Sequence, residues 1–124
     1  MKRVLIVDDD ASIRALLRMT LPSDVYEVIE AADGSEVMEL LEQGAPDLIV
    51  LDWKMPGRHG AFVLDDLKAR HPQLPVIVLT AEARDTQRVL AEALRADAFL
   101  TKPFSPLQLL ETIERLLGPT PTTG

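Results

Sequence analysis

Three short runs of aliphatic residues, continuous rather than alternating, constrain the fold of this 124-residue chain most. They lie at residues 4–7, 48–51 and 76–79, and weaker candidates lie at 25–29 and 98–101. Continuous apolar runs are typical of strands that are buried on both faces, as in a parallel sheet covered by helices. The sequence therefore predicts one parallel sheet of five strands.

Apolar residues at helical spacing separate these runs. The predicted helices lie near residues 13–20, 37–41, 63–67, 84–94 and 105–117. Asp33 is expected to cap the second helix. Ser105 and Gln108 have the spacing of a capping box at the start of the last helix, and Gly118 ends it. The fourth helix is rich in alanine, and its apolar stripe is thin.

Strand and helix thus alternate along the chain. Regular alternation with short links predicts an α/β fold with right-handed crossovers and helices on both faces of the sheet. Such a chain suits a flavodoxin-like (βα)5 three-layer sandwich with strand order 2-1-3-4-5. The expected domain spans residues 1–117. Residues 118–124 have no apolar side chain to bury, so they are expected to form a flexible tail or the start of a linker.

The composition argues against several classes of function. The chain has no cysteine, which excludes a disulfide scaffold and a thiolate zinc site. Its net charge of -7 argues against direct binding of nucleic acid by a basic face. No apolar run approaches the roughly 20 residues that span a bilayer. We therefore expect a cytoplasmic protein that binds neither nucleic acid nor a membrane.

Polar residues follow four of the predicted strands at the points where the strands end. They are Asp8, Asp9 and Asp10 after the first strand, Asp52 after the third, Thr80 after the fourth and Lys102 after the fifth. Ligands of open parallel sheets bind beyond the carboxyl ends of the strands, near the point where the strand order reverses. These side chains are therefore predicted to share one site.

The carboxylates of this predicted site favour a metal ion. Clustered carboxylates repel one another unless a cation neutralises them. Oxygen ligands suit Mg²⁺, with Mn²⁺ as an alternative. Asp8, Asp9 and Asp52 are the candidate ligands, and the backbone carbonyl of Lys54 is a fourth.

The same site has the groups that phosphoryl transfer requires. A carboxylate beside a bound metal can attack a phosphoryl group, and the transfer depends on positioning and on charge neutralisation. Asp52 is the candidate nucleophile, Lys102 the neutralising cation and Thr80 a hydrogen-bond donor to a phosphoryl oxygen. Singly, each has a plainer interpretation, because such residues often cap helices or face solvent, and Asp10 is expected to be a cap. A chain without such a site would require all of these plainer interpretations to hold at four strand ends at once, which favours a shared site.

From about residue 2 to residue 117, the sequence closely resembles the receiver domains of bacterial two-component response regulators. The matching motifs lie at residues 4–10, 52–57, 79–81 and 100–104. Each is short, but their order and spacing on alternating strands are highly specific. The resemblance implies that Asp52 is the phosphoacceptor and that Asp8 and Asp9 hold Mg²⁺.

The resemblance also implies roles for the remaining site residues. Thr80 corresponds to the switch hydroxyl and Lys102 to the family's lysine. Phe99 corresponds to an aromatic side chain that turns inward when the hydroxyl engages the phosphoryl group, although it would otherwise be an ordinary core residue. Pro103 corresponds to a proline that usually follows a cis peptide bond. Lys54 and Glu82 occupy positions that tune how fast the phosphoryl group is lost.

The partners are implied by the same resemblance. A sensor histidine kinase or a phosphotransfer protein would donate the phosphoryl group, and the domain would catalyse only its own phosphorylation and dephosphorylation. The surface formed by the fourth helix, the fifth strand and the fifth helix would then act on an effector domain or partner protein. The chain would be a monomer or a phosphorylation-dependent dimer. Arg88 and Asp97 fit the charged pairs of one dimer known in the family, but Ala93, Ala98, Gln108 and Thr112 do not.

The chain departs from the family pattern at two further positions. His59 stands where an acidic residue is common, and its plain interpretation is a solvated loop residue. Arg95 stands where glycine is common, at the end of the fourth helix. If the backbone there is left-handed, arginine is strained by roughly 1 kcal/mol relative to glycine.

Two other classes of protein share some of these features. Phosphohydrolases with an aspartate nucleophile also use Mg²⁺, but they usually have a general acid two residues after the nucleophile, where this chain has Lys54. Flavin carriers of similar topology need a phosphate-binding loop after the first strand. Asp8, Asp9 and Asp10 would repel a phosphate there unless a metal intervened.

Overall fold

The computed structural model describes residues 1–53, 60–80 and 95–118. Its centre is a parallel sheet of five strands in the order β2-β1-β3-β4-β5. The strands are β1 (Lys2–Val7), β2 (Tyr26–Ala31), β3 (Leu48–Asp52), β4 (Val76–Thr80) and β5 (Ala98–Thr101). The predicted flavodoxin-like fold and its strand order are thereby confirmed.

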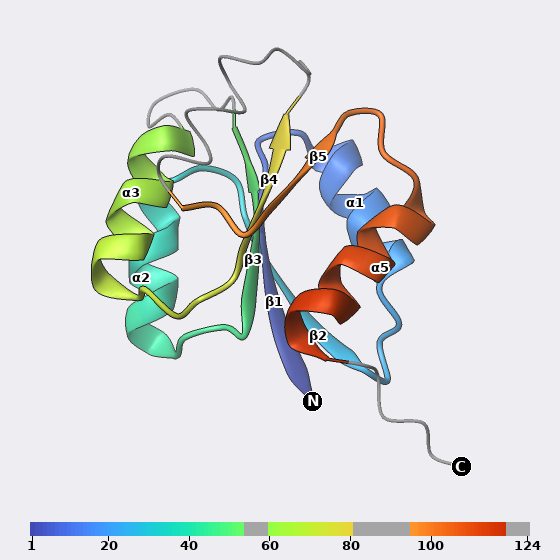
Figure 1. The fold of residues 1–124 in the computed structure, drawn as a ribbon, viewed down its shortest axis with the longest axis horizontal. Coiled ribbons are helices and arrows are strands. Elements are labelled where there is room, and N and C mark those ends of the chain that lie inside the picture. The colour runs from blue at the N-terminus through green and yellow to red at the C-terminus, as the bar shows by residue number, and fades with distance from the viewer. Residues whose placement is uncertain (54–59, 81–94, 119–124) are drawn as a thin grey trace.

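Helices cover both faces of the sheet and complete three layers (Figure 1). α1 (Ala11–Thr20) and α5 (Pro106–Leu117) lie on one face, and α2 (Ser35–Gln43) and α3 (Gly60–Arg70) lie on the other. The helix predicted at 84–94 falls outside the described residues. No helix in the described part of the chain is long and apolar enough to cross a membrane.

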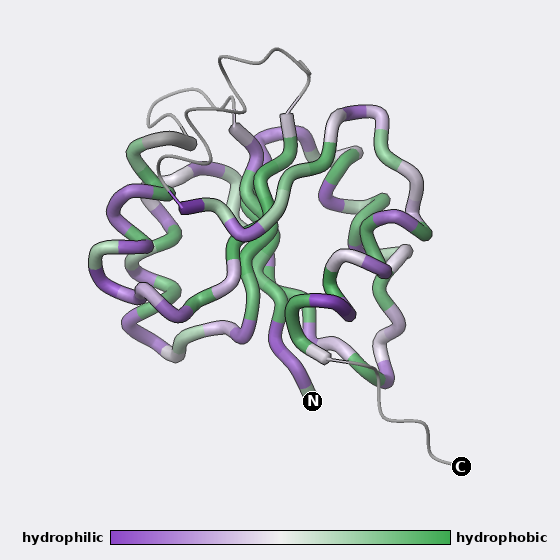
Figure 2. Tube along the Cα trace, in the orientation of Figure 1, coloured by the Kyte–Doolittle hydropathy of each residue, from purple (hydrophilic) through white to green (hydrophobic). Residues whose placement is uncertain are grey.

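Each face of the sheet has its own apolar core, and successive strand residues enter opposite cores. In β1, Leu5 packs with α2 and α3, whereas Ile6 packs with α1 and α5. In β3, Ile49 packs in the core on the α2 and α3 face, and Val50 packs in the core on the α1 and α5 face. Figure 2 shows the strands as a largely hydrophobic band through the middle of the molecule. The aliphatic runs are continuous because both faces of these strands are buried.

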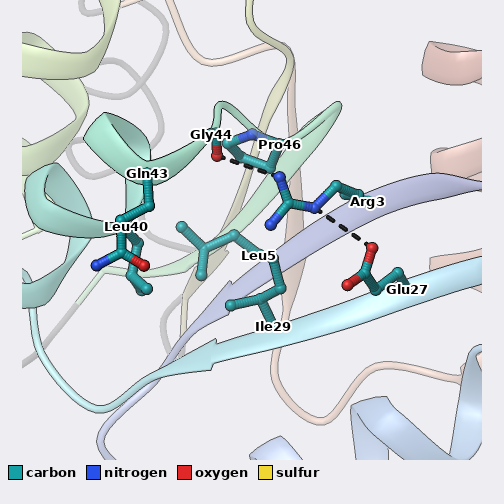
Figure 3. Close-up of a pocket in the computed structure, with 8 residues that line it drawn as sticks. All are labelled: Arg3, Leu5, Glu27, Ile29, Leu40, Gln43, Gly44 and Pro46. Carbon is teal, nitrogen blue, oxygen red and sulfur yellow. Dashed lines mark hydrogen bonds and ion pairs between the residues drawn. The ribbon is translucent and has the colours of Figure 1, made fainter.

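The strand register brings the carboxyl ends of the strands to one edge. Asp52 at the end of β3 pairs with Leu79, and Thr80 at the end of β4 pairs with Thr101. A pocket of about 190 Å³ lies toward the amino ends of β1 and β2 instead (Figure 3). An ion pair between Arg3 Nε and Glu27 Oε2, 3.4 Å long, lies at this pocket. The pocket therefore lies apart from the edge of the sheet that carries the predicted site.

Candidate functional site

The turn that links β1 to α1 holds the first two acidic residues of the site. Asp8 is fully buried, and its N–H continues the ladder by donating to the Ala31 carbonyl at 3.1 Å. Asp9 is exposed. The N–H of Asp10 donates to Asp8 Oδ1 at 2.9 Å, and Asp10 Oδ1 accepts from the Ser12 N–H at 2.8 Å. Asp10 is therefore the N-cap of α1, as predicted.

The third acidic residue, Asp52, ends the central strand β3 and is 5% exposed. The N–H of Trp53 donates to the Leu79 carbonyl at 2.9 Å, which fixes the backbone just beyond Asp52 against β4. Asp8, Asp9 and Asp52 each offer a carboxylate oxygen, and these atoms lie within 4.8 Å of one another. The structure thus brings together the three side chains predicted to bind a metal.

Lys102 reaches this cluster from the residue after β5. Its N–H donates to the Thr80 carbonyl at 2.7 Å, which holds the backbone against β4. Its Nζ lies 3.2 Å from Asp8 Oδ2 and 3.3 Å from Asp52 Oδ1. Burial acts to lower the pKa of Lys102, but attraction to Asp8 and Asp52 outweighs burial and raises the pKa above its ordinary value. Lys102 therefore stays protonated between the two carboxylates.

Thr80, Phe99 and Pro103 lie on the neighbouring strands. Thr80 is the last residue of β4, directly after the residue that pairs with Asp52, so it belongs to the same edge. Phe99 lies within β5 and packs, partly buried, against the core on the α2 and α3 face. The peptide bond between Lys102 and Pro103 is cis, as predicted. Lys54, His59 and Glu82 lie outside the residues that the structure describes.

Arg14 also reaches the acidic turn, and no pattern in the sequence pointed to it. Its Nη1 donates to the backbone carbonyl of Asp8 at 2.7 Å. The available signal was a basic residue in the first turn of α1, four residues after the N-cap Asp10. A long side chain there points back toward the start of its helix, and therefore toward this turn.

Two features of the segment before β5 bear on the predictions. Arg95 has a φ of 69°, so the left-handed backbone considered for this position is present. Asp97 Oδ2 accepts from Lys68 Nζ at 2.7 Å and from the Val76 N–H at 2.8 Å. The carboxylate that fits an intermolecular pair in the family dimer is therefore already bound within this chain.

The chemistry of these donors fits a small divalent cation. Three carboxylates share one nearby ammonium in the described residues, so the cluster keeps an excess of negative charge. All of the offered side-chain ligands are oxygens, which Mg²⁺ and Mn²⁺ prefer. The cluster can thus bind a cation while Lys102 supplies a further positive charge to an incoming anion.

Comparisons with known proteins agree with this arrangement. A family model described as the response regulator receiver domain matches residues 4–114. The alkaline phosphatase synthesis transcriptional regulatory protein PhoP of Bacillus subtilis is 39% identical over 116 residues, which cover 94% of this chain and 48% of PhoP. A probable transcriptional regulator ycf27 of Cyanophora paradoxa is 40% identical, with the same coverage of 94% and 48%. This chain therefore spans about half the length of these curated relatives.

Solved structures show the same likeness. The chemotaxis protein CheY4 of Vibrio cholerae matches with a TM-score of 0.88 and 34% identity, over 94% of this chain and 99% of CheY4. A CheY-like receiver domain protein of Methanospirillum hungatei matches with a TM-score of 0.88 and 33% identity, over 94% of each chain. Both likenesses extend over nearly the whole of the present chain.

Proposed function

This chain belongs to the family of response regulator receiver domains, and from that premise we propose that Asp52 is its phosphoacceptor. Phosphorylation of an aspartate is typical of this family. The observation that carries the proposal is the position of the Asp52 carboxylate, which lies 3.3 Å from Lys102 Nζ and beside Asp8 and Asp9. In the described part of the chain, Asp52 is a buried carboxylate that belongs to the candidate cation site and also contacts an ammonium group.

The transfer uses Asp52 as the nucleophile. One of its carboxylate oxygens attacks the phosphorus of a phosphohistidine on the donor, the bond from phosphorus to the imidazole nitrogen breaks, and that nitrogen takes up a proton. The product is an aspartyl phosphate. Attack of water on the phosphorus later releases inorganic phosphate and restores the carboxylate. The domain thus catalyses only its own phosphorylation and dephosphorylation, and we do not class it as an enzyme.

Asp8, Asp9 and Asp52 are the residues that would hold the cation in this proposal. Bound Mg²⁺, or Mn²⁺ in its place, would offset the negative charge of the phosphoryl oxygens during transfer. Lys102 contributes a second positive charge from β5, and its raised pKa keeps it charged. The proposed fourth ligand, the carbonyl of Lys54, lies outside the described residues, as does Glu82, the second proposed tuning residue.

The proposed output follows from the residues beside the site. Thr80 would donate its hydroxyl to a phosphoryl oxygen, and Phe99 on the adjacent strand β5 would change its packing in response. We propose a sensor histidine kinase or a phosphotransfer protein as the donor, and an effector domain or partner protein on the β5 and α5 surface as the receiver of the signal. The chain would be a monomer, or a dimer that forms on phosphorylation, and the domain would not bind nucleic acid directly.

The test is phosphorylation of the purified chain by acetyl phosphate with Mg²⁺, followed by intact mass measurement. The wild-type chain should gain one phosphoryl group, chelation of Mg²⁺ should prevent the gain, and Asp52→Asn should abolish it. Asp47→Asn is the matched control, because Asp47 precedes β3 at its opposite end and binds the Arg3 N–H at 2.7 Å. It should be phosphorylated like the wild type. Full phosphorylation of Asp52→Asn would overturn the proposal.

A further inference from the structure

The acidic turn is held from α1 by a single side chain, that of Arg14. Strand β1 ends at Val7, so the carbonyl of Asp8 lies beyond the regular ladder. A buried carbonyl without a partner costs free energy. Arg14 Nη1 supplies that partner at 2.7 Å, and the Arg14 N–H donates to the Asp10 carbonyl at 3.1 Å. One residue therefore binds two carbonyls of the turn that presents Asp8 and Asp9.

The guanidinium of Arg14 is itself held in place by Glu30 on β2. Arg14 Nε donates to Glu30 Oε1 at 3.2 Å, and the two side chains are only 20% and 32% exposed. Arg18 Nη2 lies 2.7 Å from the other oxygen, Glu30 Oε2. Because guanidinium groups are planar and donate in fixed directions, contacts with both Glu30 and Asp8 restrict the orientation of Arg14 strongly.

Glu30 also decides how the charge of Arg14 affects the site. An unpaired guanidinium beside the carboxylates of Asp8 and Asp9 would repel an incoming cation. Pairing with the Glu30 carboxylate at 3.2 Å offsets part of that charge, because Arg18 shares the same carboxylate. Arg14 can therefore hold the Asp8 carbonyl while opposing cation binding less than an unpaired guanidinium would.

We propose that Arg14 is a positioning residue for cation binding: its hydrogen bond to the Asp8 carbonyl keeps the Asp8 and Asp9 carboxylates at a spacing that a divalent cation can bridge. The inference rests on the proposed function only in taking Asp8, Asp9 and Asp52 as the cation ligands. Residues that orient metal ligands from behind typically change metal affinity by about 10-fold to 100-fold when they are removed. We expect a weakening near the lower end of that range for Arg14.

The test is the dissociation constant for Mg²⁺ of Arg14→Gln, measured by calorimetry and by the fluorescence of Trp53, whose backbone directly follows Asp52. A positioning role predicts that the dissociation constant rises about tenfold. A charge effect alone predicts the opposite sign, because removing a positive charge should strengthen cation binding. An unchanged or lowered dissociation constant would therefore overturn the proposal.

Arg18→Gln is the matched control. It removes an equal charge and the other guanidinium that pairs with Glu30, but Arg18 donates to the Val28 carbonyl at 3.2 Å instead of the Asp8 carbonyl. Its Mg²⁺ affinity should stay close to that of the wild type, and equal weakening in both variants would count against the proposal. If Arg14→Gln does not fold, Arg14→Lys is measured in its place, because lysine keeps the positive charge but lacks the planar guanidinium.

The outcomes also separate this inference from the proposed function. If Asp52 is phosphorylated and the wild type binds Mg²⁺, but Arg14→Gln binds it equally well, only the positioning role fails. If the wild type shows no Mg²⁺ binding, both the cation site and the positioning role fail. Thermal unfolding of each variant without metal provides a further control, since a purely structural role would lower stability and leave the Mg²⁺ dissociation constant unchanged.

Discussion

Lys102 Nζ lies 3.3 Å from Asp52 Oδ1, although 50 residues separate the two in sequence. The same nitrogen lies 3.2 Å from Asp8 Oδ2, so one ammonium joins the ends of β1, β3 and β5. The side chain of Lys102 is only 22% exposed and that of Asp8 is fully buried. Because burial weakens screening by water, these contacts affect both protonation and stability.

The first prediction concerns stability at high pH. The pKa of Lys102 is raised above its ordinary 10.5. A group with a raised pKa in the folded state contributes stability that is complete below the unfolded pKa and is lost as the pH rises through the folded pKa. The free energy of unfolding of the metal-free wild type should therefore fall above about pH 10.5 more steeply than that of Lys102→Met.

Urea unfolding across that pH range measures this difference. Tyr26, whose pKa is raised by burial and by Glu114, titrates in the same region. It is present in both proteins, so its effect cancels when the two curves are subtracted. If the free energies of unfolding of the wild type and Lys102→Met change with pH in parallel, the contacts of Lys102 with Asp8 and Asp52 do not stabilise the fold.

The second prediction concerns Arg95, whose φ of 69° is costly for a residue with a Cβ atom. Glycine removes that cost but loses more backbone entropy on folding, so Arg95→Gly should gain about 0.5 to 1 kcal/mol in the free energy of unfolding. Arg115→Gly is the control, because Arg115 is exposed in α5 and should lose about 1 kcal/mol there. Denaturant unfolding of both variants tests this contrast, and destabilisation by Arg95→Gly would contradict it.

Features that depend on local sequence could be predicted well. The burial of β3 on both faces was visible as a continuous run of aliphatic residues. The cis bond before Pro103 and the left-handed backbone of Arg95 were expected from the resemblance to receiver domains, and both are present. The start of α2 was predicted less well. Gly34, not Asp33, is the N-cap, although the Asp33 carboxylate still accepts from the Ser35 N–H at 2.7 Å.

Features that depend on how helices pack could not be predicted in this way. The pairing of Arg14 with Glu30 joins α1 to β2 across 16 positions, and neither residue shows a pattern that identifies the other. The pairing of Lys68 with Asp97 joins residues 29 positions apart, and neither position shows a pattern that identifies the other. Charged side chains on helices are usually solvated, so a lysine in α3 gives no sign of burial in the sequence.

The third prediction concerns Lys68, whose side chain is 5% exposed. Its Nζ donates to the Leu74 carbonyl at 2.8 Å and to Asp97 at 2.7 Å. Asp97→Asn keeps an acceptor for the Val76 N–H but leaves the buried ammonium without its counter-charge, which should cost about 3 kcal/mol. Lys68→Met should cost less, because the side chain of Asp97 is 34% exposed and can be solvated.

Chemical denaturation of both single variants and of the double variant measures this asymmetry. The double variant should be more stable than Asp97→Asn alone, because it no longer buries an unpaired charge. Equal losses in the two single variants, with additive loss in the double variant, would show that the pair contributes nothing as a pair.

The fourth prediction concerns Asp9, which is exposed but has a carboxylate oxygen within 4.8 Å of those offered by Asp8 and Asp52. Removing its charge should relieve repulsion, so Asp9→Asn should raise the melting temperature of the metal-free chain. A ligand at one hundred times its dissociation constant adds about 2.7 kcal/mol of stability, and Asp9→Asn should lose most of that gain from Mg²⁺. The neighbouring Asp10→Asn keeps an N-cap acceptor for α1 and should respond to Mg²⁺ like the wild type. Thermal unfolding over a series of Mg²⁺ concentrations compares the three proteins. If Mg²⁺ raises the melting temperature of Asp9→Asn as much as that of the wild type, Asp9 is not a ligand of the cation.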